Sequence, residues 1–105
     1  MKILISQIEY IKPPRNFVFD ALERSYYKFL HSHELMPVPN TNKVAYNDYD
    51  CLMLTGGPDS VARNNTENLL YNDAVNKGKP IIGICHGAFA INDICKGTNG
   101  HVDGH

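Results

Sequence analysis

The chain has 105 residues, of which 43% are apolar and 20% are charged, and its formal net charge at pH 7 is −1. These values are typical of a globular protein with one domain and a small core. The near-neutral charge gives no electrostatic reason to expect binding to nucleic acid or to an anionic membrane. No apolar run approaches the ~20 residues that span a bilayer.

Two sequence features that report on the cellular compartment both favour the cytosol. The N-terminal segment Met1–Gln7 turns polar too soon to be a secretory signal peptide. Cys51, Cys85 and Cys95 are an odd number of cysteines without paired spacing, so a disulfide framework is not expected. We therefore predict a cytoplasmic protein with free thiols.

The first half of the chain predicts a strand, a helix and a second strand. The short apolar run Ile3–Ile5 predicts the first strand, and Pro13-Pro14 breaks the chain soon after it. Asn16 is a suitable N-cap for a helix that runs to about His33. Apolar residues recur along one face of this helix, namely Phe19, Leu22, Tyr26, Phe29 and Leu30. The run Leu35–Val38 predicts the second strand.

The second half of the chain continues the alternation of strands and helices. Its expected elements are, in chain order, the strand Tyr49–Thr55, a helix from about Thr66 to Asn76, the strand Pro80–Ile84 and a helix from His86 to about Lys96. Gly78 is expected to end the first of these helices in a left-handed conformation. Such alternation is typical of a parallel sheet covered by helices on both faces, so the predicted fold class is α/β.

The residues before the helix at Thr66 have two local interpretations. Asn64-Asn65-Thr66 matches a glycosylation acceptor, but in a cytosolic chain we interpret it as the cap of the helix. Arg63 and Glu67 are four residues apart. We expect them to form a weak ion pair at the surface, which contributes only about a few tenths of a kcal/mol.

The stretch Gly83-Ile84-Cys85-His86-Gly87 has the spacing of a nucleophile elbow, in which the nucleophile stands on a sharp turn from a strand to a helix. The glycines let the two backbones pass closely, and a helix N-terminus favours the reactive thiolate of Cys85. The backbone N–H of His86 would then point to a developing oxyanion. A second donor is expected from the Gly56-Gly57 loop at the end of the preceding strand.

The alternative is that Cys85 only fills space in the core, as we expect of Cys51 and Cys95. The pattern Gly-x-Cys-x-Gly is a weak signal by itself. Three neighbouring features favour the nucleophile: the aliphatic strand before Cys85, the helical pattern after it, and the Gly-Gly-Pro loop that follows the preceding strand.

The segments "DYDCLMLTGGPDS" (48–60) and "GKPIIGICHGAFAINDICKG" (78–97) resemble the class I glutamine amidotransferases. The nearest branch is that of γ-glutamyl hydrolases and stand-alone amidotransferase-like hydrolases, and "ISQ", "DALERSYYKFL" and "MPVPN" add to the likeness. The resemblance implies a flavodoxin-like fold and a reaction in which Cys85 opens a γ-glutamyl amide through a thioester, releasing ammonia or an amine. It also implies that Gly57 and His86 supply backbone N–H groups to the oxyanion. No cofactor is expected.

Two departures from the family pattern concern the substrate and the catalytic base. The family usually has Gln four residues after the cysteine, where this chain has Phe89. Either the ring contacts a γ-glutamyl amide that differs from glutamine, or it simply packs. The family also has a downstream His followed two residues later by Glu. His101-Val102-Asp103 imitates this pair, but the spacing leaves no room for the intervening strands, so we interpret it as a loop. A metal site of His101, Asp103 and His105 is not expected.

The sequence therefore predicts a single domain over residues 1–105, truncated after the nucleophile helix, from an enzyme that hydrolyses a small-molecule γ-glutamyl amide. This part alone is expected to react with electrophiles at Cys85 without turnover, and to be marginally stable or to self-associate. Two alternatives stay open. One is a glutamine amidotransferase subunit that passes ammonia to a partner synthase, and the other is a binding module that lacks the base.

Overall fold

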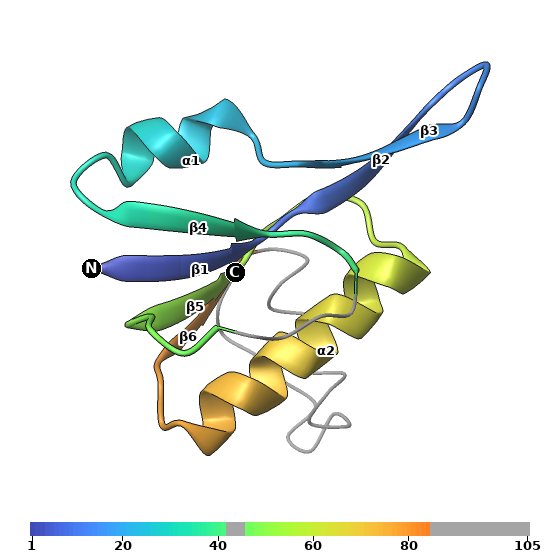
Figure 1. Cartoon of the computed structure of the whole chain (residues 1–105). Coiled ribbons are helices and arrows are strands. Elements are labelled where there is room, and N and C mark those ends of the chain that lie inside the picture. The colour runs from blue at the N-terminus through green and yellow to red at the C-terminus, as the bar shows by residue number, and fades with distance from the viewer. Residues whose placement is uncertain (42–45, 85–105) are drawn as a thin grey trace.

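The computed structural model describes residues 1–41 and 46–84, which form a four-stranded parallel sheet with helices and a separate two-stranded hairpin (Figure 1). β1 (Lys2–Ser6) lies between β4 (Glu34–Val38) and β5 (Cys51–Leu54), and β6 (Ile81–Gly83) pairs with the other side of β5. The order β4-β1-β5-β6 is that of the first four strands of a flavodoxin-like sheet. The predicted fold class is confirmed.

Within residues 1–41 and 46–84, each face of the sheet packs against one helical segment, because successive residues of a strand point to opposite faces. On one face, Leu4 and Leu52 pack with Leu70 of α2 (Val61–Asn76). The other face packs against the end of α1 (Arg24–Phe29), and its buried residues are Ile3, Ile5, Leu30, Cys51 and Met53. Since both faces are covered, the two central strands are apolar over Ile3–Ile5 and Cys51–Leu54, as buried parallel strands tend to be.

The long helix predicted from Asn16 to about His33 is wrong. This part of the chain instead completes an antiparallel hairpin of β2 (Ile8–Lys12) and β3 (Phe17–Ala21). Figure 1 shows the hairpin projecting from the sheet. The helix that follows, α1, has only six residues.

The local chemistry of the turn and of the second strand explains this hairpin. Asn16 has a left-handed φ of 56°, which asparagine tolerates better than most residues, so it closes the turn instead of capping a helix. Phe17-Val18-Phe19 is a run of aromatic and β-branched residues, which favour a strand. Phe19 lies beside Tyr10 of β2, with ring centroids 6.4 Å apart. The same apolar residues also fit a helical spacing, so spacing alone assigns them wrongly.

Helix α2 begins earlier than predicted. Its N-cap is Ser60 rather than Asn64-Asn65-Thr66, and Ser60 Oγ accepts a hydrogen bond from the Arg63 N–H at 3.2 Å. The helix ends at Asn76 as predicted, and Gly78 just beyond it has a left-handed φ of 66°. Within the described ranges, neither helix is long and apolar enough to cross a membrane.

A buried tyrosine connects the segment before β5 to α2. Tyr49 is 2% exposed, and its hydroxyl donates to Asp73 Oδ2 at 2.7 Å. Lys77 Nζ donates to the same oxygen at 3.0 Å and lies 5.5 Å from the centre of the Tyr49 ring. Burial and the hydrogen bond to Asp73 raise the pKa of Tyr49 above its usual range, because both disfavour the phenolate.

We expect the Tyr49 hydroxyl to make stability depend on pH at the alkaline end. Because its pKa is higher in the folded protein than in the unfolded chain, its contribution is complete below about pH 10 and is lost as the pH rises toward the folded value. At pH 7, Tyr49→Phe should be less stable by about 1–2 kcal/mol. Above about pH 10, the thermal midpoint of the wild type should fall more steeply than that of the variant. Parallel profiles would contradict this role of Tyr49.

Candidate active site at the carboxyl edge of the sheet

The order of strands reverses between β1 and β5, because the chain leaves β1 for one side of the sheet, at β4, and returns on the other side at β5. In open parallel sheets, ligands bind beyond the carboxyl ends of the strands at such a point. β1 ends in Ser6, and Thr55 directly follows β5; both side chains are buried. The candidate site therefore lies beyond these two residues.

Ser6 and Thr55 join the two strand ends through buried hydrogen bonds. The Thr55 N–H donates to Ser6 Oγ at 2.9 Å, and Thr55 Oγ1 donates to the Ser6 carbonyl oxygen at 3.0 Å. Their hydroxyl oxygens are 3.2 Å apart. These side chains hold the strand ends in register and so position the loop that follows Thr55.

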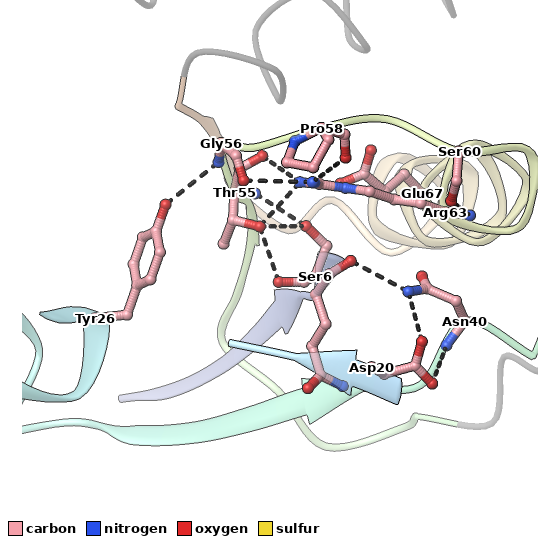
Figure 2. A network of polar contacts seen from close by, with 11 residues as sticks. Ser6, Asp20, Tyr26, Asn40, Thr55, Gly56, Pro58, Ser60, Arg63 and Glu67 are labelled. Atoms are coloured by element: carbon pink, nitrogen blue, oxygen red, sulfur yellow. Dashed lines mark hydrogen bonds and ion pairs between the residues drawn. The ribbon is translucent and has the colours of Figure 1, made fainter. Parts of the chain in front are cut away.

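The guanidinium of Arg63 lies behind that loop, between the loop and Glu67 (Figure 2). It donates to the carbonyl oxygen and Oγ1 of Thr55, and to the carbonyl oxygens of Gly56 and Pro58 at 3.3 and 3.0 Å. Arg63 Nε donates to Glu67 Oε2 at 3.2 Å. One side chain of α2 therefore holds three backbone carbonyl groups of the loop.

The weak surface pair predicted for Arg63 and Glu67 is wrong, since their side chains are 0% and 1% exposed. Both lie on the face of α2 that also carries Leu70 and Ala74, three or four residues apart, and this face is buried. Removing one partner of a buried ion pair leaves an uncompensated charge, which costs roughly 3–5 kcal/mol. The pair is thus part of the support of the loop.

Gly57 is the predicted oxyanion donor, and it lies in this loop. Its φ of 113° is one that other residues rarely adopt, and a Cβ at this position would come 2.7 Å from Cγ2 of Ile8. The N–H of the neighbouring Gly56 donates to the Tyr26 hydroxyl at 3.3 Å. Within residues 1–41 and 46–84, the Gly57 N–H donates no hydrogen bond. It is therefore the better placed of the two amides to receive a ligand oxygen.

A cavity of about 410 Å³ lies beside the loop, a volume in the range of small-molecule sites. Its lining comes from the hairpin, the start of α1, the loop and the residue after β6, namely Ile8, Ala21, Leu22, Glu23, Tyr26, Thr55, Gly56, Gly57, Pro58 and Ile84. The Ile84 N–H donates to the Leu54 carbonyl oxygen at 2.9 Å. Ile84 is the residue before Cys85, so the chain meets the cavity directly before the predicted nucleophile.

The other predicted site residues, Cys85, His86 and Phe89, lie outside the part of the chain that the structure describes. The same holds for Cys95, interpreted as a core residue, and for His101, Asp103 and His105, interpreted as loop residues. The described histidines do not line the cavity. His33 Nδ1 is 3.3 Å from the N-terminal amine, at the start of β1, and His31 lies near it in the chain. In the two described ranges, no three His, Cys, Asp or Glu side chains are arranged to hold a metal ion.

Arg63, Thr55 and Tyr26 belong to the candidate site but were not predicted. Thr55 has a signal in the sequence, because it stands between the apolar strand and the Gly-Gly loop, where the reversal of strand order predicts a ligand site. Arg63 has none, since arginine on a helix is mostly exposed. The spacing of Tyr26 assigns it to the apolar face of a helix and gives no indication of a site.

The sheet order, the loop after β5 and the cavity define an α/β protein with a candidate ligand site at the carboxyl edge of the sheet. The family model described as "Glutamine amidotransferase class-I" matches residues 16–99, more than half of the chain, and the chain therefore belongs to this family. None of the curated proteins compared with the chain matches it. Membership confirms the resemblance to the class I glutamine amidotransferases. It also supports an activity of the glutamine amidotransferase type, because members of the family are typically enzymes.

Proposed function

We propose that the protein hydrolyses a γ-glutamyl amide of a small molecule, with Cys85 as the nucleophile. The observation that carries this proposal is the cavity between the Gly57 loop and Ile84. A cysteine that follows Ile84 would meet, across this cavity, a backbone N–H in a position suited to an oxyanion. Phe89 in place of the usual Gln favours an amide other than glutamine itself. We also propose a cytosolic location, consistent with the free thiol of Cys51.

The proposed reaction has two stages. The Cys85 thiolate bonds to the amide carbon, and the carbonyl oxygen becomes an oxyanion. This oxyanion accepts hydrogen bonds from the backbone N–H groups of Gly57 and His86. The C–N bond then breaks, the amine takes a proton, and a thioester remains. Water adds to the thioester carbon and loses a proton, the C–S bond breaks, and glutamate leaves with the thiolate restored.

A second group must move the protons in both stages. His31 and His33, the histidines of the described part, do not line the cavity: His33 lies beside the N-terminal amine and His31 beside the Lys28 carbonyl oxygen. We therefore assign proton transfer to the downstream His and Glu that the family resemblance implies. The described residues contribute the binding cavity and one oxyanion donor.

Alkylation rates of the cysteines test the assignment of the nucleophile. Cys51 is 2% exposed, and burial raises the pKa of its thiol, so little reactive thiolate forms near neutral pH. Iodoacetamide at pH 7 should therefore modify Cys85 at least about tenfold faster than Cys51 in the folded protein. Peptide mass mapping over time measures both rates. Equal rates would contradict the assignment of Cys85 as the nucleophile. Release of glutamate from γ-glutamyl anilides is the separate test of turnover.

A further inference from the structure

The buried guanidinium of Arg63 does more than pair with Glu67, because it also donates hydrogen bonds to the backbone of the predicted oxyanion loop. We propose that Arg63 is a positioning residue, which turns the Gly56–Gly57 peptide so that its N–H faces the cavity. This inference rests on the proposed function, because it explains how the oxyanion donor is oriented. It assigns to Arg63 a role in the reaction without contact with the substrate.

The direction of the carbonyl groups carries the first step. Arg63 binds the carbonyl oxygens of Thr55, Gly56 and Pro58 from the side of α2. In a planar trans peptide, the N–H points away from the C=O. Because the Gly56 carbonyl points to Arg63, the N–H of Gly57 in the same peptide points to the opposite side.

The preceding peptide shows independently which side this is. The Thr55 carbonyl also points to Arg63, and the Gly56 N–H of that peptide donates to the Tyr26 hydroxyl at 3.3 Å. Tyr26 lines the cavity, and Figure 2 shows it on the side of the loop opposite to Arg63. The N–H groups of this loop are therefore turned toward the cavity.

The chemistry of arginine explains why this residue suits the task. Its five N–H donors have five acceptors here: three loop carbonyls, Thr55 Oγ1 and Glu67 Oε2. A lysine has three donors at one point and cannot cover this spread of acceptors. The charged group also polarises the peptides whose carbonyls it binds, which strengthens their N–H groups as donors.

Two electrophiles test this role in the full protein, because only one of them forms an oxyanion when it reacts with the thiolate. Iodoacetamide alkylates a thiolate directly and forms no oxyanion. A γ-glutamyl chloroketone first accepts the thiolate at its carbonyl carbon, so its oxygen becomes an oxyanion before sulfur displaces chloride. In Arg63→Lys, we expect the chloroketone rate at Cys85 to fall on the order of 10²-fold, while the iodoacetamide rate changes less than about twofold. Arg63→Gln, which keeps a planar group with two donors, is made in parallel.

Leu70→Ala is the matched control, because Leu70 is buried on the same face of α2 but belongs to the apolar core cluster with Leu4 and Leu52 of the sheet. This variant should lose stability and keep the wild-type ratio of the two rates. Three results would overturn the proposal. They are an equal fall of the two alkylation rates in the Arg63 variants, a selective fall of the chloroketone rate in Leu70→Ala, and unfolding of both Arg63 variants. If the wild type reacts with iodoacetamide but not with the chloroketone, the proposed function is contradicted, and the proposed role of Arg63 is contradicted with it.

Discussion

The variant Cys85→Ala is expected to release no measurable ammonia or amine from γ-glutamyl amides, a loss on the order of 10⁶-fold in kcat. Alanine has no group that can form the thioester, and within the described residues the other thiol, Cys51, is buried in the sheet. The assay is turnover of a γ-glutamyl anilide by the purified full-length protein.

Cys51→Ala is the control for this experiment. It removes a thiol from β5, and Cys51 does not line the cavity, so kcat should stay within about twofold of the wild type. The thermal midpoint should fall slightly, because a buried side chain becomes smaller. Turnover by Cys85→Ala at the wild-type rate would mean that the hydrolysis uses another nucleophile.

The second large effect is expected for Gly57→Ala. The new Cβ would meet Ile8 Cγ2 at 2.7 Å, and the φ of 113° is strained for alanine, so the loop must move. A shift of about 1 Å in a reacting group can cost on the order of 10²-fold, and we expect kcat to fall by this factor. Steady-state kinetics and the thermal midpoint are measured on the same preparation.

Gly78→Ala is the matched control for the strain, because Gly78 also has a positive φ, of 66°, but no atom lies within 4 Å of a Cβ built there. Its cost should be limited to stability, about 1 kcal/mol, with kcat unchanged. An unchanged kcat in Gly57→Ala would instead show that the Gly57 N–H is not the oxyanion donor. Gly56 is then a poor substitute, because its N–H donates to Tyr26.

The sequence by itself determined the central sheet and the family. Strands predicted at Ile3–Ile5 and Tyr49–Thr55 are observed as Lys2–Ser6 and Cys51–Leu54. Such strands are predictable because a parallel strand buried on both faces must be apolar throughout, and polar residues, glycine or proline mark its ends. Gly78 is predictable for a similar local reason, since a left-handed residue at the end of a helix favours glycine.

Only the tertiary structure decided between helix and hairpin after β1. Phe17-Val18-Phe19 and the residues that follow satisfy both a helical spacing and a strand composition. The strand forms because β2 is adjacent and pairs with it, Tyr10 with Phe19 and Ile11 with Val18. A pairing between two segments is not a property of either segment alone.

The support of the candidate site was likewise decided by tertiary structure. Arg63 is predicted at the surface because an arginine is costly to bury without partners. Its partners are the carbonyl oxygens of Thr55, Gly56 and Pro58, which face it only after the loop has folded back on α2. Backbone acceptors leave no mark in the sequence, so the loop glycines are predictable and the side chain that orients them is not.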